Sequence, residues 1–196
     1  MASTKLTRKE QAAETKNLLF QTALQLLEQV PFEQITIRDI VKQAGVSIGT
    51  FYNYYATKLD VYYETYLIAD EFFENTVKKE VALISDTLGK LRCYFDNYSR
   101  YNCEISGPAL TRLLYNVDNH QFDRQTHTGM LPLWTGIIKE GLENGTLHSD
   151  LSPEEITEFL MIALRGQVYH WCTHDCSYDL PNKIAAQSEL LLKIFL

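Results

Sequence analysis

The chain has 196 residues, of which 45% are hydrophobic and 22% are charged, with a formal net charge of −7. This composition is typical of a soluble globular protein with a proper core. No apolar run reaches the ~18 residues of a membrane span, and the N-terminus has no apolar stretch of a signal peptide. We therefore expect a cytoplasmic protein without a membrane partner, and with its four cysteines reduced.

The charge is unevenly distributed along the chain. Over residues 1–60 Lys and Arg slightly outnumber Asp and Glu, so the remainder carries the acidic excess. This small excess of positive charge is too weak to attract nucleic acid through a strong positive field. Any DNA contact must depend on a few well-placed side chains.

The first predicted helix begins after Thr7, which forms a capping box with Glu10, and it ends at Pro31. Ahead of it, Met1–Leu6 is either a basic arm that reaches DNA or a plain solvated terminus. The apolar residues recur on one side of the helix, so we expect it to support the helices that follow. This buried stripe consists of Leu19, Ala23, Leu26, Leu27 and Val30.

Two short helices joined by a tight turn come next. Thr36 and Asp39 form a capping box at the start of the first helix. Gly45 follows its last apolar position and can adopt the positive φ of a helix C-cap. Ser47 caps the second helix, expected over Ile48–Tyr55, and the pair predicts a helix-turn-helix. The apolar stripe of the first helix is Ile37, Ile40, Val41 and Ala44.

The second of these helices has side chains suited to the major groove. Phe51 and Tyr55 lie four residues apart and anchor it in the head. Its hydroxyl and amide groups can donate to phosphates or to base edges. The alternative is an ordinary helical hairpin with an aromatic surface. The residues predicted to contact DNA are Thr36, Arg38, Ser47, Ile48, Gly49, Thr50, Tyr52, Asn53, Tyr54 and Lys58.

A dense motif therefore runs from Thr36 to Val61, TIRDIVKQAGVSIGTFYNYYATKLDV. It resembles the DNA-binding signature of the TetR family of bacterial transcriptional regulators. Two positions depart mildly from the family pattern, Tyr55 where Phe is common and Val61 where Leu is common. The matching positions are Thr36, Ile40, Ala44, Gly45, Val46, Ser47, Gly49, Thr50, Phe51, Tyr52, Tyr54, Lys58 and Val61.

The remainder of the chain predicts only helices, with no strand pattern, repeat or low-complexity segment. The first of them, over residues 57–84, has no Pro or Gly and can act as a lever between head and body. Further helices are expected over residues 86–102, from Pro108, over 131–144, from Ser152, and from Pro181 to the terminus. Cys103–Gly107, Asn116–Gly129 and Ser177–Pro181 are expected to separate them.

Three local signals refine the later helices. Gly145 is placed to cap the helix before it. Ser152 and Glu155 form a capping box with Pro153 at the first helical position. Gly166 lies inside a helix, where Gly costs about 1 kcal/mol against Ala, and close packing of another backbone would explain it.

These elements predict an all-α protein with a three-helix DNA-binding head, residues 1–57, and a roughly six-helix ligand-binding and dimerisation body, residues 58–196. The family resemblance implies a repressor that binds a palindromic double-stranded DNA operator and is released by a small-molecule effector. No catalytic or cofactor motif occurs, so we predict neither an enzyme nor a bound cofactor.

The last two helices are more apolar than a lone domain needs. Leu190, Ile194 and Leu196 cluster with other apolar residues at the very end of the chain, where chains are usually polar. We expect a four-helix homodimer interface about a two-fold axis, the alternative being burial within one protomer. The residues predicted for this interface are Phe159, Ala163, Gly166, Leu191 and Phe195.

The body also carries aromatic side chains with polar tips, as small-molecule pockets do. Each of them is equally explained as ordinary core, and the family resemblance favours a cavity among the body helices. The residues predicted to contact an effector are Phe95, Tyr98, Leu113, Trp134, Ile138, Gln167 and Trp171.

A cluster of His and Cys side chains offers an alternative, a metal- or thiol-sensing regulator. On a continuous helix Cys172 and Cys176 share one face and His170 and His174 share another, about 200° away. All four cannot meet unless the helix ends there, and no second ligand pair is evident. We therefore predict no metal site and read the segment as a polar helix end.

Overall fold

The computed structural model describes residues 7–116 and 130–196, and every regular element in these ranges is helical. The predicted all-α fold is therefore confirmed. The chain divides into two compact units, Met1–Thr65 and Tyr66–Leu196, with the division inside α4 (Lys58–Phe72). The boundary expected from the sequence, after residue 57, is the start of that helix. The expected arm over 1–6 and the expected loop over 117–129 lie outside the described residues.

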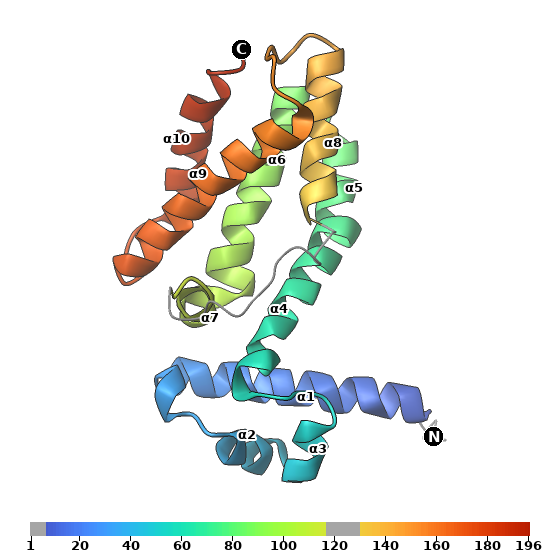
Figure 1. Cartoon of the computed structure of the whole chain (residues 1–196), viewed down its shortest axis with the longest axis vertical. Helices are drawn as coiled ribbons and strands as arrows, with labels where there is room; N and C mark the ends of the chain where they lie inside the picture. Colours follow the sequence, from blue (N-terminus) through green and yellow to red (C-terminus); the bar gives the residue numbers. More distant parts are fainter. Residues whose placement is uncertain (1–6, 117–129) are drawn as a thin grey trace. The chain divides into compact units, whose positions relative to one another are not determined.

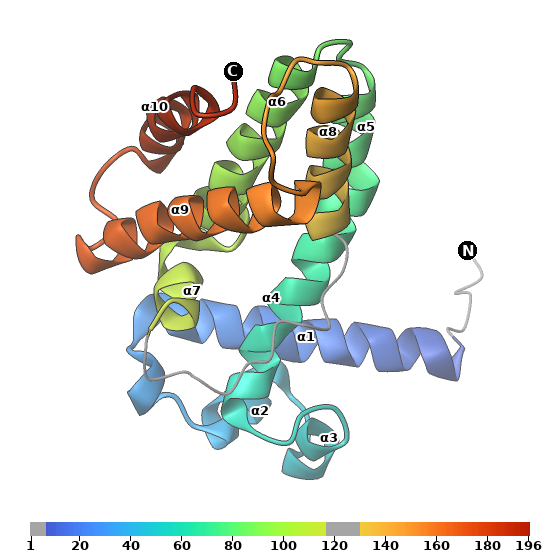
Figure 2. The ribbon, with the colours of Figure 1, turned by 45° about the horizontal axis from the view of Figure 1, so that its top comes forward.

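The first unit is built on α1 (Arg8–Gln29). A short 3-10 turn, η1 (Phe32–Gln34), leads to α2 (Ile37–Ala44) and α3 (Ile48–Tyr52), which lie on the same side of α1 in Figure 1 and Figure 2. The first part of α4 completes this unit, and the Tyr62 hydroxyl donates to the Ala23 carbonyl at 3.1 Å. Side chains from all four α-helices form the core: Leu19, Phe20, Ala23, Ile40, Val41, Phe51, Val61 and Tyr62.

Local capping signals decide where these helices begin. The capping boxes predicted at Thr7, Thr36 and Ser152 are all present. Gly45 takes φ 69° and Gly145 takes φ 74°, the left-handed conformation that a helix C-cap requires. The predicted end of the third helix was wrong, since α3 stops at Tyr52 where residue 55 was expected. At this end the bonding includes i→i−3 pairs, from the Asn53 amide to the Thr50 carbonyl at 3.3 Å and from the Tyr54 amide to the Phe51 carbonyl at 3.0 Å.

The long helix predicted over residues 57–84 is present as a continuous helical path in three parts. A π turn, η2 (Phe73–Val77), links α4 to α5 (Lys78–Ala82). A π turn adds one residue to a helical turn and shifts the face that follows. Phe73, Val77 and Val81 are all buried, so the apolar stripe stays on the core side through the shift.

The second unit packs around α6 (Thr87–Arg100), which lies between α8 (Met130–Glu143) and α10 (Leu180–Leu192) in Figures 1 and 2. The long α9 (Pro153–Thr173) contacts both α8 and α10. The break predicted at residues 103–107 is largely helical. A π turn, η3 (Tyr101–Ile105), extends α6, and α7 (Gly107–Leu114) begins at Gly107 with φ 75°.

Aromatic side chains fill the centre of the second unit. The Tyr94 ring lies 4.9 Å from Phe73 and 4.9 Å from Trp134, measured between ring centroids. Phe95 meets the same indole edge-on at 5.3 Å. Each of these rings is almost completely buried. Tilted and edge-on contacts of this kind stabilise a core beyond the area they bury.

No other described segment of the same chain approaches Gly166, so the close backbone approach expected there stays a prediction for a partner chain. A Cβ built on Gly166 meets no atom within 4 Å, because this residue lies on the exposed side of α9. Gly141 of α8 is the tight position. A Cβ there would lie 2.7 Å from Leu147 Cδ1 and 2.7 Å from Thr87 Cγ2.

Replacing Gly141 by Ala therefore forces a methyl group into a filled site, and we expect the free energy of unfolding to fall by about 1–3 kcal/mol. Gly136→Ala in the same helix is the matched control. Its Cβ meets nothing within 4 Å, so the variant should gain about 0.5–1 kcal/mol from helix propensity. Urea denaturation of both variants measures the difference, and equal stabilities would contradict the packing described for Gly141.

Candidate nucleic-acid interface

Capping hydrogen bonds fix the start of α2 on one side of the turn and the start of α3 on the other. The Asp39 amide donates to Thr36 Oγ1 at 3.2 Å, and the Thr36 amide donates to Asp39 Oδ2 at 2.9 Å. Hydrogen bonds from the Thr36 hydroxyl and then from its amide lower the pKa of Asp39. On the other side, Ser47 Oγ accepts from the Thr50 amide at 3.0 Å. The turn that carries α3 is therefore specified by its own residues.

One aromatic side chain sets the orientation of α3. Phe51 is completely buried in the head, and its ring packs against Tyr55 at 5.6 Å and edge-on against Tyr52 at 5.7 Å. Both Phe51 and Tyr55 are buried, as predicted from their spacing. Because Phe51 points inward, the opposite side of this short helix must face outward.

The outward side carries most of the residues predicted to contact DNA. Ile48 is 46% exposed and Tyr52 is 55% exposed. Thr50 and Tyr54 are half-buried, and their accessible sides extend the same surface. The other exposed members of the predicted set are Thr36, Arg38, Ser47, Gly49 and Asn53. Lys42 is also exposed and lies four residues after Arg38 on α2. Residues at this spacing share one face of a helix, so Lys42 could have been predicted together with Arg38.

Lys58 has a different environment from the rest of the predicted set. Its ammonium donates to the Phe32 carbonyl at 2.6 Å and to the Ile35 carbonyl at 2.7 Å. The same ammonium lies 3.9 Å from the centroid of the Phe32 ring. Burial lowers the pKa of Lys58. This side chain is therefore not the free point charge that the sequence suggested, and it joins the segment before α2 to the start of α4.

Comparison with known families identifies this arrangement. A family model described as "Bacterial regulatory proteins, tetR family" matches residues 19–64, which include α2, the turn and α3. Residues 19–64 therefore match the DNA-binding region of the TetR family. The relatives that resemble the chain over most of its length are a metabolism regulator and a transcriptional repressor. Among the described residues, no helix has both the length and the apolar character needed to cross a membrane.

Similarity to individual proteins extends over nearly the whole chain. The fatty acid metabolism regulator protein of Bacillus subtilis (strain 168) is 21% identical over 178 residues, which are 89% of this chain and 92% of that protein. The crystal structure of the regulator FadR from B. subtilis in complex with stearoyl-CoA has a TM-score of 0.72 at 20% identity, covering 90% of this chain and 97% of that one. Thermus thermophilus FadR, a TetR-family repressor in complex with lauroyl-CoA, has a TM-score of 0.70 at 26% identity, covering 92% and 95%.

The residues predicted to contact an effector lie inside the second unit. Gln167 is half-buried and donates to the Tyr178 hydroxyl at 2.7 Å, and the Trp171 indole donates to the Tyr178 carbonyl at 2.9 Å. The Trp134 indole N–H is buried and has no hydrogen-bond partner among the described residues. The buried members of the set are Phe95, Tyr98, Leu113, Trp134, Ile138 and Trp171, and their contact with an effector stays a prediction.

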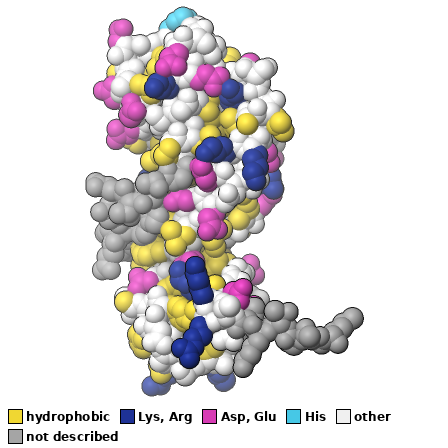
Figure 3. All heavy atoms as spheres, turned by 90° about the vertical axis from the view of Figure 1, so that its right-hand side faces the viewer, with side chains coloured by type: hydrophobic (Ala, Val, Ile, Leu, Met, Phe, Trp, Pro, Cys, Tyr) yellow, Lys and Arg dark blue, Asp and Glu magenta, His cyan; other side chains and the backbone are white. Residues whose placement is uncertain are grey.

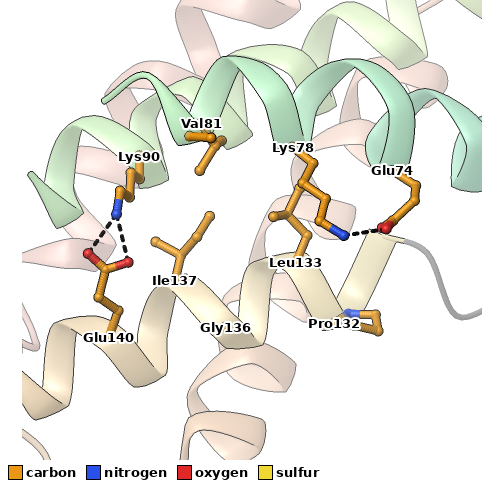
Figure 4. Close-up of a pocket in the computed structure, with 10 residues that line it drawn as sticks. Glu74, Lys78, Val81, Lys90, Pro132, Leu133, Gly136, Ile137 and Glu140 are labelled. Atoms are coloured by element: carbon orange, nitrogen blue, oxygen red, sulfur yellow. Dashed lines mark hydrogen bonds and ion pairs between the residues drawn. The ribbon is translucent and has the colours of Figure 1, made fainter. Parts of the chain in front are cut away.

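An open groove of about 440 Å³ lies between α5 and α8, away from these residues. Figure 4 shows Val81, Leu133 and Ile137 along its apolar part, with an ion pair at each end. Lys90 donates to both Glu140 carboxylate oxygens, at 2.6 and 2.7 Å, and Lys78 pairs with Glu74 at the other end. Since each lysine already has a carboxylate partner, the groove presents no free charge to a ligand.

Charges of both signs are interspersed over the second unit. On the face drawn in Figure 3, Lys and Arg side chains lie among Asp and Glu side chains with hydrophobic groups between them. No single-sign field covers this face. This agrees with the sequence, in which the acidic excess follows residue 60.

The predicted dimer residues are only partly accessible. Phe195 is 4% exposed and packs edge-on against Phe159 of its own chain, with ring centroids 6.0 Å apart, so this residue was wrongly assigned to a partner contact. Its carbonyl also accepts from the His148 amide at 2.7 Å, which holds the C-terminus in place. Leu191 and Ala163 are half-buried, whereas Phe159 and Gly166 are exposed. Leu190 and Ile194, which belong to the apolar cluster named from the sequence, are exposed, and so are Ile162 and Tyr169, which the sequence reading did not assign to the interface.

All four cysteines are free thiols. Burial, then the neighbouring Cys176, raises the pKa of Cys172 to about 12, and burial raises the pKa of Cys176 as well. A thiol must lose its proton to ligate a metal or react with an oxidant. The environment of this pair therefore disfavours the thiol-sensing alternative.

The position of Lys58 leads to a prediction about stability. Lys58→Met removes the donor to two backbone carbonyls, and we expect the free energy of unfolding to fall by about 1–3 kcal/mol. Lys42→Met, at an exposed lysine of α2, is the control and should unfold like the wild type. Urea denaturation followed by far-UV circular dichroism checks both. An unchanged midpoint for Lys58→Met would mean that its bonds to the two carbonyls are dispensable.

Proposed function

We propose that this TetR-family regulator is a repressor that binds a palindromic operator as a homodimer and is released from it by a small-molecule effector. The observation that carries the proposal is the outward face of α3. Phe51 is completely buried, while Ile48 and Tyr52 on the same five-residue helix are about half exposed. A helix of this kind presents its N-terminal residues to base edges in the major groove.

The chemistry of this face suits DNA contact without a strong field. Tyr52 and Asn53 offer a hydroxyl and an amide, and Arg38 adds a cation on α2. Hydroxyl, amide and guanidinium groups donate to phosphates and read base edges. The exposed backbone at Gly49 leaves space for close approach. The contacts are few, which is why we propose that two heads act together.

Apolar side chains on α9 and α10 support the homodimer. Phe159, Ile162 and Tyr169 recur on the exposed side of α9. Leu190 of α10 is exposed too, as is Ile194 just after that helix ends. Ile162 and Leu190 are each 65% exposed, more than isolated surface positions of a monomer explain. Gly166 lies in the same row on α9 with open space over its Cα. A partner helix can approach closely there, as in a four-helix interface about a two-fold axis.

The relatives suggest the effector class to test first. The two FadR structures hold acyl-CoA molecules, stearoyl-CoA in one and lauroyl-CoA in the other. In this chain the interior of the second unit is aromatic and aliphatic, so a cavity that opened there on binding would have apolar walls. The buried Trp134 N–H without an acceptor is the kind of group that a ligand oxygen satisfies. We therefore propose a fatty acyl thioester as the effector.

Release would follow from a population shift. An effector that binds better to a conformation in which the heads misfit the operator lowers DNA affinity by that difference, commonly about 1–3 kcal/mol. The helical path α4–η2–α5 joins the head to the body in the chain, so it is the element through which we propose the shift travels. A π turn within it supplies a place where the helical register can change.

Operator binding is the first test. The purified protein should bind the DNA upstream of its own gene selectively, and log K should fall linearly with log salt by about 0.9 per phosphate contact. Tyr52→Ala should weaken this binding at least ~10-fold while leaving the melting temperature unchanged, since one good base or phosphate contact is worth about 1–3 kcal/mol. Fluorescence anisotropy with labelled DNA measures both.

The same assay contains its controls and extends to the effector. Lys79→Ala, at an exposed lysine of α5, should bind DNA like the wild type. Lauroyl-CoA or stearoyl-CoA should release the DNA, whereas free coenzyme A should not. Equal affinity for operator and random DNA, or full binding by Tyr52→Ala, would contradict the proposed DNA face. Release by neither thioester would contradict only the effector class.

The dimer has its own test. Ile162→Glu places a charge in the proposed interface, so we expect a monomer in analytical ultracentrifugation and at least ~10-fold weaker operator binding. Leu83→Glu is the matched control, because Leu83 is 89% exposed at the turn between α5 and α6. A monomeric wild-type protein, or an unchanged dimer for Ile162→Glu, would reject this interface.

A further inference from the structure

Two histidines at the end of α9 form a stacked pair that the proposed regulator does not use. His170 and His174 are exposed and lie four residues apart on the last turn of the helix. Their rings are parallel to within 25°, with centroids 4.0 Å apart. Residues at this spacing share one face of a helix, so both imidazoles point to the same region of solvent.

Hydrogen bonds fix the proton on the His174 ring. Its Nδ1 lies 2.8 Å from the His170 carbonyl oxygen. A carbonyl oxygen can only accept, so Nδ1 carries the proton and donates it. In the neutral imidazole Nε2 is then left with a free lone pair. A histidine held through Nδ1–H on a backbone carbonyl is the arrangement found around metal-ligating imidazoles.

His170 has a matching partner on the following segment. Its Nδ1 lies 3.0 Å from the Tyr178 hydroxyl, which also accepts from Gln167 Nε2 at 2.7 Å. The Tyr178 proton can point to the Gln167 carbonyl, 3.4 Å away. The hydroxyl then accepts a hydrogen bond from His170 Nδ1–H, and His170 Nε2 keeps a free lone pair. Both rings therefore have an available Nε2 and an oriented Nδ1.

We propose that His170 and His174 form a surface site for a divalent transition-metal ion such as Zn²⁺, bound through the two Nε2 atoms. Imidazole suits Zn²⁺, Ni²⁺ and Cu²⁺, with Zn–N bonds of about 2.0–2.1 Å, and two histidines four residues apart on one helix face can ligate a single ion once their rings turn toward it. Within the described ranges no cluster of three or more His, Cys, Asp or Glu side chains suits a metal. Water therefore completes the coordination, and the ion exchanges readily.

The nearby thiols do not compete for this ion. Cys172 lies about 200° around the helix from His170, and burial keeps its thiol protonated. The C-terminal turn of α9 also favours a cation, because the free carbonyls at the end of a helix carry partial negative charge. An ion that joins His170 to His174 would clamp this turn immediately before Asp175 and Cys176, which both take positive φ, 54° and 55°.

The test uses the full-length protein without a polyhistidine tag, titrated with ZnCl₂ in a buffer that does not bind metals. Isothermal titration calorimetry should show one ion per chain, and the melting temperature should rise with ZnCl₂ and return on adding EDTA. His174→Ala should bind at least ~10-fold more weakly. Tyr178→Phe should also lose about tenfold, because the partner that orients His170 is removed.

Control variants separate this site from other possibilities. His148→Ala removes an exposed histidine between α8 and α9 and should bind like the wild type. Cys176→Ser should also keep the affinity. No measurable binding, wild-type affinity in His174→Ala, one ion per two chains, or loss of binding in Cys176→Ser would each overturn the proposal. None of these measurements depends on DNA or on the effector.

Discussion

A helix of five residues cannot hold itself together in water, and α3 depends entirely on how its neighbours bury one ring. Phe51 is that ring. It is completely buried, and its burial turns Tyr52 and Ile48 outward. The capping bonds at Ser47 and Gly45 fix where the helix starts, but only the packing of Phe51 fixes which side of it faces outward. The proposed operator contacts all follow from this one constraint.

Lys58 shows how the same constraint extends to the start of α4. A cation next to a DNA-reading helix suggests a phosphate contact, yet here its ammonium satisfies the carbonyls of Phe32 and Ile35. Those carbonyls belong to the turn before α2, where the Phe32 carbonyl also accepts from the Ile35 amide at 3.1 Å. The Lys58 ammonium thereby links the segment before α2 to the start of α4. The helix-turn-helix and the first turns of α4 share one core.

The second unit combines a packed aromatic interior with a buried donor that has no acceptor among the described residues. Its aromatic interior is closely packed around Trp134 and Tyr94, while the indole N–H of Trp134 lacks an acceptor among the described residues. A buried donor without an acceptor is costly, and the proposed effector would lower that cost by supplying an oxygen. On the opposite side of α9, apolar side chains stay exposed, which a second copy would cover.

The sequence alone determined the features that depend on residues three or four apart. Capping boxes, glycine C-caps, the long helix into the body and the helix-turn-helix motif are local, so spacing and residue type were enough to predict them. The anchoring role of Phe51 and Tyr55 was predictable for the same reason. The family followed from the same dense motif.

Only the tertiary structure decided what depends on distant neighbours. Phe195 turned inward because Phe159 and the His148 amide lie beside it, Lys58 found two carbonyls, and Gly166 faced open space while Gly141 was crowded. The histidine pair was visible in the sequence, but its tautomers were not, since they depend on a carbonyl and on Tyr178. Packing and hydrogen-bond partners come from segments far apart in the chain, and no local pattern encodes them.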